Sequence, residues 1–546
     1  MEEVQKLQRK ISIGTETSEI KTPSVWRDYF PAIFVIVGAF LMTALRLQIG
    51  AGFISDGALM MLALASYLIA ALFLLTNLYA PSEMAKKIGF FTGALGVFFN
   101  LSSWLVRWVN GFEFQKASLP QKEFIDWLSR SLPFANLYDL SLAFAFGAGI
   151  STLLVANRKH FQILSAFTLP LAALILILAR FIGGEFVDFP PVLDSYWRPI
   201  HVGVASLSYG VALVCFAVAV IYLLKDKVKV EAMAIFSSIF AFAVIGTISK
   251  FSVFSEFVYR SGLFSPNVEG SKPFNAFFRL EIPYVGITLV IAGILLLGVI
   301  ASFCFYLYQN NKKAKTVGHI LLKLSLVVQI AAIVFLVSGI KSSGNIYPRL
   351  QDELTKNSWQ HSIVGKQLLS QRVSAGKISP TDFAALTPSQ FEAEGKQYFQ
   401  NNGAKMYLSL NTNPVELAGL ITALAGTFFV ILFAFRTEKL RERLPSLASL
   451  DGLMYKTACL AFAGLAMLLI TGAIWANESW GRPWGFDSKE TGALVAWLTY
   501  AAFLHTRISR GWTGRSSAYF AVVAFLFVIF TYLGVSYLLP GLHSYA

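Results

Sequence analysis

Runs of about 20 apolar residues recur along the whole chain, and this pattern restricts its fold more than any other feature of the sequence. A helix rises about 1.5 Å per residue, so a run of that length crosses the roughly 30 Å hydrocarbon core of a bilayer. Of the 546 residues, 55% are hydrophobic and 14% are charged, which is far more apolar surface than one soluble core could bury. We therefore expect an all-α fold, a polytopic bundle of transmembrane helices.

We count about thirteen such runs by the length that a transmembrane helix requires. They are 30–49, 58–80, 88–108, 136–156, 162–183, 201–224, 232–252, 284–309, 317–340, 413–435, 453–475, 490–507 and 517–539. The first begins only near Tyr29, after a long polar tail, and is long enough to span, so we expect it to stay in the membrane and not to be cleaved as a signal peptide.

Lys and Arg residues in the short loops predict the orientation of the bundle, because they mark the cytoplasmic side. They gather in alternate loops, as one consistent topology requires, namely the N-terminal tail, 86–87, 158–159, 225–229, 312–315, 436–443 and 507–515. This pattern predicts that the N-terminus is inside and the C-terminus outside. The same loops account for most of the net charge of +14, which therefore indicates orientation and contact with anionic lipids, not nucleic-acid binding.

Four longer segments are then external, namely 109–135, 184–200, 253–283 and 341–412. Only 341–412 is large enough to fold as a small external domain, and its scattered apolar residues predict short helices. The three cysteines, Cys215, Cys304 and Cys459, lie within predicted spans and form no CxxC pair, so we expect small buried apolar side chains.

The stretch 475–490, WANESWGRPWGFDSKE, carries most of the chemistry in the sequence. Trp475, Trp480 and Trp484 alternate with Gly and Pro residues, which predicts a loop and not a helix, and an aromatic platform on which a flat macrocycle could stack. The alternative is an interfacial belt, because Trp is enriched where a membrane meets water. The run of Gly, Pro, Asp487, Lys489 and Glu490 among the rings favours a shaped site.

Histidine is the second informative residue type, because the chain has only six: His160, His201, His319, His361, His505 and His543. His201 begins a span on the external side and His543 follows the last span, so both could reach the tryptophan loop and supply the two axial ligands of a haem iron. The alternative is that each is merely solvated or hydrogen-bonded. His505 lies near the cytoplasmic end of its helix, and an ionisable residue within a span is a functional candidate.

These motifs together resemble the CcsA/ResC family, the haem-handling membrane proteins of System II cytochrome c maturation. The resemblance rests on WGRPWGFDSKETGALVAWLTYAAFLHTR at 480–507, GVSYLLPGLHSYA at 534–546, LPFANLYDLSLAF at 132–144 and LDSYWRPIHVGVASLSYG at 193–210. It covers about 90–225 and 445–546, and the motifs occur in the family's order.

The resemblance implies that His201 and His543 are the external ligands of haem b and that His505 is an intramembrane haem ligand. It also implies that Trp475, Trp480, Trp484 and Asp487 form the external haem-binding loop. Two residues depart from the pattern, since Phe486 replaces a usual Trp and Ser488 a usual Pro, which keeps an aromatic face but could loosen the loop.

A third departure is the length of chain between the two matching parts. We therefore expect a cytoplasmic tail (1–27), an N-terminal core (28–227), an inserted four-span segment (228–440) that contains the external domain 341–412, and a C-terminal core (441–546). Four spans is an even number, so the insertion leaves the orientation of the later helices unchanged.

The resemblance further implies a holocytochrome-c synthase, or cytochrome c haem lyase, in the inner membrane of a bacterial-type cell, with its active face outside. Its expected partners are a CcsB/ResB-like membrane protein, an apocytochrome c with a CxxCH segment, and thiol-reducing maturation proteins. Arg107 and Arg180, near the external ends of their helices, could pair with haem propionates, although snorkelling to the interface is the simpler reading for each. His319 or His160 could replace the partner's histidine, although a surface role is the simpler reading.

Two other functions remain open from the residues. One is a System I haem lyase or exporter, which shares the tryptophan-rich loop. The other is a membrane transporter, or a non-enzymatic subunit whose aromatic loop binds a quinone or a lipid.

Overall fold

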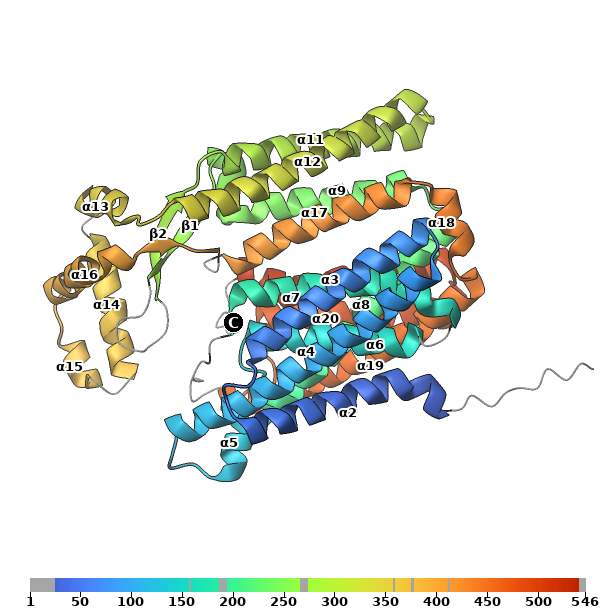
Figure 1. Ribbon diagram of the computed structural model, residues 1–546. Helices are drawn as coiled ribbons and strands as arrows, with labels where there is room; N and C mark the ends of the chain where they lie inside the picture. Colours follow the sequence, from blue (N-terminus) through green and yellow to red (C-terminus); the bar gives the residue numbers. More distant parts are fainter. Residues whose placement is uncertain are drawn as a thin grey trace, which may run out of the picture.

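The computed structural model of the chain describes residues 25–156, 159–184, 186, 194–265, 274–356, 359–374, 378–410 and 413–539. Long helices lie side by side in a bundle, and a small group of short helices and strands stands beyond one end of it (Figure 1). The expected all-α polytopic architecture is confirmed in this part of the chain.

In the described part of the chain, twelve helical segments are long and apolar enough to cross a membrane. They lie in α2 (Val25–Ile49), α3 (Asp56–Tyr79), α4 (Glu83–Ser118), α6 (Leu137–Ala156), α7 (Ser165–Ile182) with the preceding η1 (Lys159–Leu164), α8 (Trp197–Lys225), α9 (Val230–Thr247), α11 (Val285–Gln309), α12 (Lys312–Ser342), α17 (Pro414–Ala434), α19 (Leu447–Trp480) and α21 (Arg515–Ile529) with η6 (Phe530–Gly534). With these helices, the chain is an integral multi-pass membrane protein.

The thirteenth expected span, 490–507, is helix α20 (Ser488–Arg510), which is long enough but does not reach the same hydropathy. Its ends carry Lys489, Glu490, Arg507 and Arg510, which lower the average. The helix nevertheless packs against α19 and α21 and lies among the other long helices (Figure 1).

The loops that carry the Lys and Arg clusters meet at one end of the bundle, which we call the basic end. Arg441 donates to the carbonyl oxygens of Leu224 (2.8 Å) and Val228 (2.9 Å), so the loop after α17 contacts the loop after α8. Arg515 forms an ion pair with Asp226 in the same region. The segments predicted to be external meet at the opposite end, which we call the tryptophan end because α19 ends there at Trp480. This alternation agrees with the expected topology.

Which end faces the cytoplasm stays a prediction from charge. Reporter fusions at Lys229, Lys313 and Lys439 are expected to report the cytoplasm, whereas fusions within 341–412 and after Ala546 are expected to report the external side. Activity of paired cytoplasmic and external reporters measures this directly. A cytoplasmic signal from 341–412 would contradict the orientation and remove the tryptophan end from the external face.

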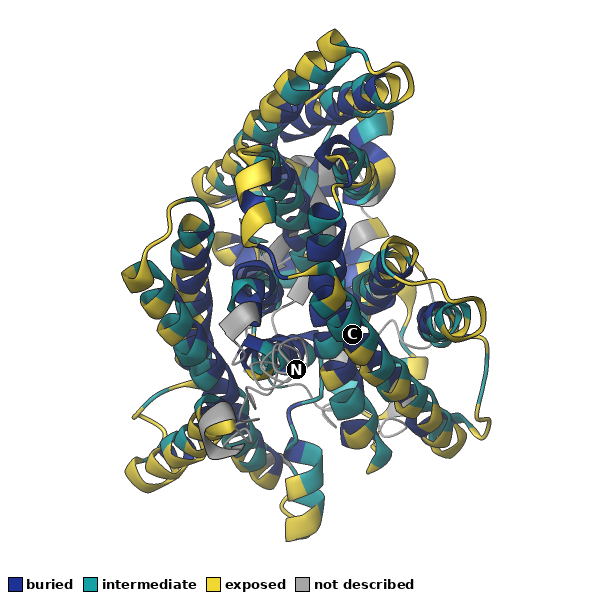
Figure 2. Cartoon of the chain, turned by 90° about the vertical axis from the view of Figure 1, so that its right-hand side faces the viewer, coloured by how far each residue is buried: buried dark blue, intermediate teal, exposed yellow. Residues whose placement is uncertain are grey.

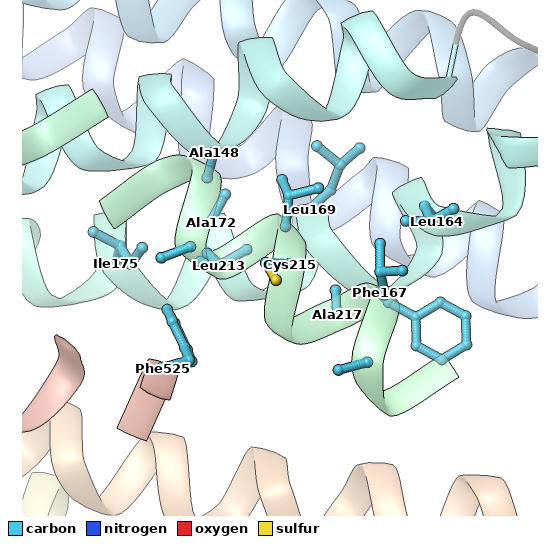
Figure 3. Packing of buried hydrophobic residues seen from close by; sticks show 14 of the residues in the cluster. Ala148, Leu164, Phe167, Leu169, Ala172, Ile175, Leu213, Cys215, Ala217 and Phe525 are labelled. Atoms are coloured by element: carbon cyan, nitrogen blue, oxygen red, sulfur yellow. The ribbon is translucent and has the colours of Figure 1, made fainter. Parts of the chain in front are cut away.

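The described residues form two large hydrophobic cores and one small cluster of Ala39, Leu101 and Leu105. The larger joins α3, α4, α6, α7, α8 and α19 to α21, and Figure 3 shows part of it around Cys215, Leu213 and Phe525. Its helices approach closely at small residues, since a Cβ on Gly210 of α8 would lie 2.4 Å from the backbone of Gly147 in α6. The smaller core joins α9, α11, α12 and α17 to the short helices within 341–412. Helices α11 and α12 form the outermost layer (Figure 1).

Exposed side chains cover the outer faces of the bundle, while buried ones lie toward its middle (Figure 2). The expectation of three buried cysteines is therefore right only for Cys215. Cys459 is half-buried and Cys304 is exposed on α11. In a membrane helix the lipid-facing side must be apolar too, so an apolar residue within a span is not necessarily buried.

The structure confirms the expected short helices in 341–412, namely α13 (Tyr347–Lys356), α14 (Trp359–Ser374), α15 (Pro380–Ala384), α16 (Pro388–Asn402) and η4 (Gly403–Lys405). Strands β1 (Arg260–Ser265), β2 (Phe274–Glu281) and β3 (Tyr407–Leu408) form an antiparallel sheet of order β2-β1-β3, which was not predicted. Smaller elements complete the fold: α5 (Phe124–Ser131), η3 (Ile248–Phe251), α10 (Ser252–Glu256), α18 (Thr437–Arg443) and α22 (Val535–Leu538).

Candidate functional site

His201 lies in the first turns of α8 at the tryptophan end, as the sequence predicts. Its Nδ1 lies 3.0 Å from the carbonyl oxygen of Leu468 and 3.4 Å from Oγ1 of Thr471, both in α19. A carbonyl oxygen only accepts, so Nδ1 must carry the proton and donate it. The neutral imidazole then has its lone pair on Nε2, which is the form in which histidine binds a metal.

The start of α8 is held in place by several polar contacts. The Ser195 hydroxyl donates to Oε2 of Glu478 (2.8 Å) at the end of α19, and it accepts the N–H of Trp197 (3.1 Å). Arg198 donates to the carbonyl oxygen of Arg130 (3.0 Å), which lies in the last turn of α5. These bonds hold the start of α8 against the end of α19 and against α5, and so fix the imidazole of His201.

Tyr196 adds a contact at the outer rim of the same region. Its hydroxyl donates to Oδ1 of Asp126 (2.8 Å), and this hydrogen bond lowers the pKa of that carboxyl. Tyr196 is exposed and Asp126 is only half-buried, so the contact orients the segment before α8 without adding much stability.

Trp475 and Trp480 are helical, which corrects the prediction that all three tryptophans lie in a loop. Helix α19 continues to Trp480 and ends at Gly481, whose φ of +68° suits glycine. The Trp475 ring lies 5.7 Å from the His201 ring and 6.4 Å from the Trp480 ring. Trp475 is only 5% exposed, and its indole N–H has no hydrogen-bond partner among the described residues. A buried donor beside an aromatic wall fits a polar, planar ligand.

Residues 481–487 form the remaining loop, and its shape is set by a capping box at the start of α20. The Asp487 carboxylate accepts the N–H of Lys489 (2.9 Å), while Oε2 of Glu490 accepts the N–H groups of Gly485 (2.9 Å) and Asp487 (3.2 Å). Asp487 therefore shapes the loop, and its predicted contact with haem stays untested. The capping box offsets the loosening expected from the Ser488 and Phe486 departures.

Trp484 pairs edge to face with Phe486 at 6.1 Å, apart from the Trp475–Trp480 pair. The Phe486 side chain is 79% exposed, so an aromatic edge stands open at the tip of the loop. The first residue of α20 is Ser488, a position that also tolerates proline, so either residue can begin this helix.

Arg107 is 1% exposed and lies well inside α4, which continues beyond the span expected for it. Its guanidinium forms an ion pair with Asp139, lies 3.3 Å from the Asp56 carboxylate and donates to the carbonyl oxygen of Gly184 (2.6 Å). These contacts favour a structural role over the predicted contact with a haem propionate, which stays untested. Arg180, at the end of α7, is exposed and has no ion pair among the described residues.

His505 is exposed near the basic end of α20, as predicted. On the same face of this helix, an apolar groove of about 430 Å³ lies between α20 and α21. It is lined by Val495, Leu498, Thr499, Ala502, Tyr519, Phe520, Val523 and Phe527. Arg507 pairs with Asp451 of α19 through both oxygens, which fixes the helix end beside His505. The volume lies within the usual range of cofactor pockets.

The remaining four histidines differ in their surroundings. His319 lies 3.1 Å from the Glu231 carboxylate, which Lys315 also contacts (2.9 Å), so it belongs to an ion cluster at the basic end. His361 of α14 is buried against Phe399 of α16. His160 lies in η1 near the basic end, without a described side chain, and His543 lies outside the described residues.

The sequence of the chain matches the family model described as cytochrome c assembly protein over residues 134–249 and 413–543. A cytochrome c biogenesis protein CcsA from Prochlorococcus marinus (strain MIT 9301) is 33% identical over 241 residues, which cover 44% of this chain and 69% of that relative.

The chain belongs to the CcsA/ResC family.

Shorter matches reach higher identity. A CcsA from Prochlorococcus marinus (strain MIT 9515) is 56% identical over 137 residues, covering 25% of this chain and 43% of the relative. One from Chlamydomonas reinhardtii is 43% identical over 126 residues, covering 23% of this chain and 36% of the relative. In both cases the match spans less than half of the CcsA relative.

All three predicted histidine ligands and the tryptophan loop lie within the residues that match the CcsA/ResC model. The unmatched segment between the two parts is 250–412, which is shorter than the expected insertion 228–440. It contains two candidate spans, α11 and α12, while α9 and α17 fall mostly within the matched residues. Two is again an even number, so the orientation of the later helices is the same.

Sequence reasoning missed the residues of α19 that hold His201. Leu468, Thr471, Gly472 and Trp475 are spaced i, i+3, i+4 and i+7, so they share one face of the helix. This periodicity was visible in the sequence, but nothing in it indicated that the face meets a histidine of α8.

Gly472 provides a direct test of this CcsA/ResC site. A Cβ there would lie 2.8 Å from Cε1 and 3.1 Å from Nδ1 of His201, so Gly472→Ala must displace the imidazole from the Leu468 carbonyl. We expect haem affinity to fall about tenfold or more, the scale seen when a partner of a metal-binding histidine is lost. Haem titration of the purified protein measures this.

The matched control is Gly452→Ala in the same helix, where a Cβ meets no described atom within 4 Å. Alanine favours a helix in both variants, so neither should unfold the protein. Equal haem affinity of the two variants would contradict the contact between His201 and α19.

Proposed function

We propose that the chain presents haem on the external face of a bacterial-type cytoplasmic membrane and helps to attach it to the CxxCH segment of apocytochrome c. The observation that carries this proposal is the His201 imidazole, whose Nδ1 proton is used by the Leu468 carbonyl while Trp475 and Trp480 lie beside the ring. Such a histidine has Nε2 as its ligand atom, and the neighbouring rings suit a porphyrin face. Family membership supports the proposal independently.

Haem b is the cargo of the outer site, held between His201 and His543. Capping of α20 gives the loop 481–487 a fixed shape, and so presents Trp484 and Phe486 at its rim. Arg180 is better suited than Arg107 to meet a propionate, because the Arg107 guanidinium already pairs with two carboxylates.

The attachment step joins each CxxCH thiol to a haem vinyl group. Sulfur bonds to one vinyl carbon and a proton goes to the other, so the addition requires no further oxidant or reductant. The protein contributes mainly position, because it holds the macrocycle still while an extended peptide reaches its edge. The histidine of CxxCH then replaces one ligand of the protein, which allows the product to leave.

A second station lies toward the basic end. His505 and the groove between α20 and α21 would receive haem from the cytoplasmic side, with the second axial ligand supplied by a CcsB/ResB-like partner. The apolar lining of the groove suits a porphyrin, and the exposed position of His505 leaves room for a second protein.

Reconstitution in a bacterial strain without its own maturation system tests this function. The chain is expressed with a CxxCH reporter cytochrome, with and without a CcsB/ResB-like protein. We expect covalent haem on the reporter only when the chain is present, and more of it with the partner. A reporter whose two cysteines are replaced by serine is the control. A colourless purified chain that takes up no haemin would instead favour a quinone- or lipid-binding protein.

A further inference from the structure

The unmatched segment 250–412 joins the family core at two points that lie against each other. The chain leaves the core after Ser249 and returns at Asn413. Ser249 Oγ accepts the N–H of Arg260 (3.1 Å), and Asn413 Nδ2 donates to the carbonyl oxygen of Arg260 (3.4 Å). Strand β1, which begins at Arg260, is therefore bound to both junctions.

Glu416 lies between these junctions and is 3% exposed. It stands in the first turn of α17, where an acidic side chain also interacts favourably with the helix dipole. Its Oε1 accepts the N–H of Ser249 (2.9 Å) and the hydroxyl of Tyr537. One carboxylate oxygen thus connects the exit of the inserted segment, its return, and the last helix among the described residues.

Tyr537 belongs to α22, which has only four residues and follows the π-helical turn η6. Helix α22 is the last turn of the continuous helical segment 515–538, and helix ends fray, so contacts with the rest of the protein help to fix its position. π-Helical turns are rare and occur often at functional sites. His543 follows Tyr537 by six residues, a reach of at most about 20 Å. The place of Tyr537 therefore limits where His543 can go.

We propose that Glu416 is a positioning residue that ties α22 to both junctions of the inserted segment and so sets the point from which the residues leading to His543 start. This inference rests on the proposed function, because His543 must be a ligand for its position to matter. In this role the Glu416 carboxylate does not contact haem. It acts through Tyr537, and it makes the outer site dependent on how the inserted segment sits.

The test removes the tyrosine hydroxyl alone. In Tyr537→Phe we expect the bis-histidine, low-spin share of the outer haem to fall at least twofold, with added imidazole restoring it. Tyr532→Phe is the matched control, because its buried hydroxyl lies 2.6 Å from Ser141 Oγ of α6 and is in the same helical segment without touching Glu416. The control should keep the wild-type spectrum.

A double variant shows whether the tyrosine acts through the tail. If it does, Tyr537→Phe should change nothing further in a His543→Gly protein, because coupled positions are not additive. Glu416→Leu, which removes both acceptors, should shift the spectrum in the same direction as Tyr537→Phe. Size-exclusion elution and thermal unfolding of each variant identify any general loss of fold.

The outcomes separate the two proposals. A wild-type chain that binds no haem overturns the proposed function. A haem-bearing wild type overturns only the present inference if Tyr537→Phe keeps its spectrum, if Tyr532→Phe shifts equally, or if the Tyr537→Phe effect persists in His543→Gly.

Discussion

We expect that replacing His201 with Gly will remove haem from the outer site and stop its attachment to apocytochrome c. The substitution deletes the imidazole that α19 orients through the Leu468 carbonyl, so one axial ligand is lost. We expect the affinity for haem to fall well beyond the tenfold expected for Gly472→Ala, since the ligand itself is missing and not only displaced. Added imidazole should partly restore both haem and attachment, because it fills the vacated position without a tether. Absorption spectra and haem staining of the reporter measure these effects.

His543→Gly should give the same result if the two histidines share one haem. His505→Gly should instead reduce the haem supply with little rescue by imidazole at the outer site. The control is His361, but its ring is buried against Phe399, so His361→Gln is a better replacement than Gly. If His201→Gly and His543→Gly both keep the wild-type spectrum and attach haem normally, the two histidines are not the ligands. The tryptophans would then be interpreted as an interfacial belt.

Arg107→Gln has the second largest expected effect, and it acts on stability. The guanidinium is buried between Asp139 and Asp56, and its loss leaves two carboxylates without their cation. Breaking a buried ion pair in this way costs about 3–5 kcal/mol. We expect a large fall in the midpoint of thermal unfolding in detergent, and low yield of the variant.

Two further variants distinguish this structural role from contact with haem. The double variant Arg107→Gln, Asp139→Asn should recover part of the stability that Arg107→Gln loses, because one of the two uncompensated negative charges is removed. Arg180→Gln should leave the unfolding midpoint unchanged, since the side chain is exposed, and should weaken haem binding if Arg180 meets a propionate. A stable Arg107→Gln protein with weakened haem binding would reverse the two assignments.

The sequence predicted the helices well because the bilayer itself fixes their length. Twelve of the expected spans are helices of suitable hydropathy, and the thirteenth is the helix α20. The end of α19 was placed too early, because three tryptophans and a proline were read as one loop, whereas Gly481 ends the helix five residues beyond the expected span. Strand β3 was missed because it has only two residues and pairs with β1 across a long stretch of sequence. Strands β1 and β2 pair with each other locally, but they lie in a segment, 253–283, that was expected only as a connection between spans.

The candidate site was predictable as a set of residue types but not as a set of contacts. His201 and the tryptophans were identified from their chemistry, yet the Leu468 carbonyl that fixes the histidine tautomer depends on how α8 and α19 are rotated against each other. The same holds for Arg107, whose partners come from α3 and α6, and for Glu416. Periodicity shows which face of a helix is apolar, but not which polar groups of another helix will meet it.

The groove between α20 and α21 has a practical consequence for handling the protein. Its walls are apolar, and Leu498, Tyr519 and Val523 are each 40% or more exposed to the surroundings of the bundle. In a bilayer those surroundings are acyl chains, and in a purified sample they are detergent tails. A tail that fills the groove competes with any ligand that enters from the side. The amount of haem retained beside His505 should therefore change with the chain length of the detergent, while haem at the tryptophan end should not.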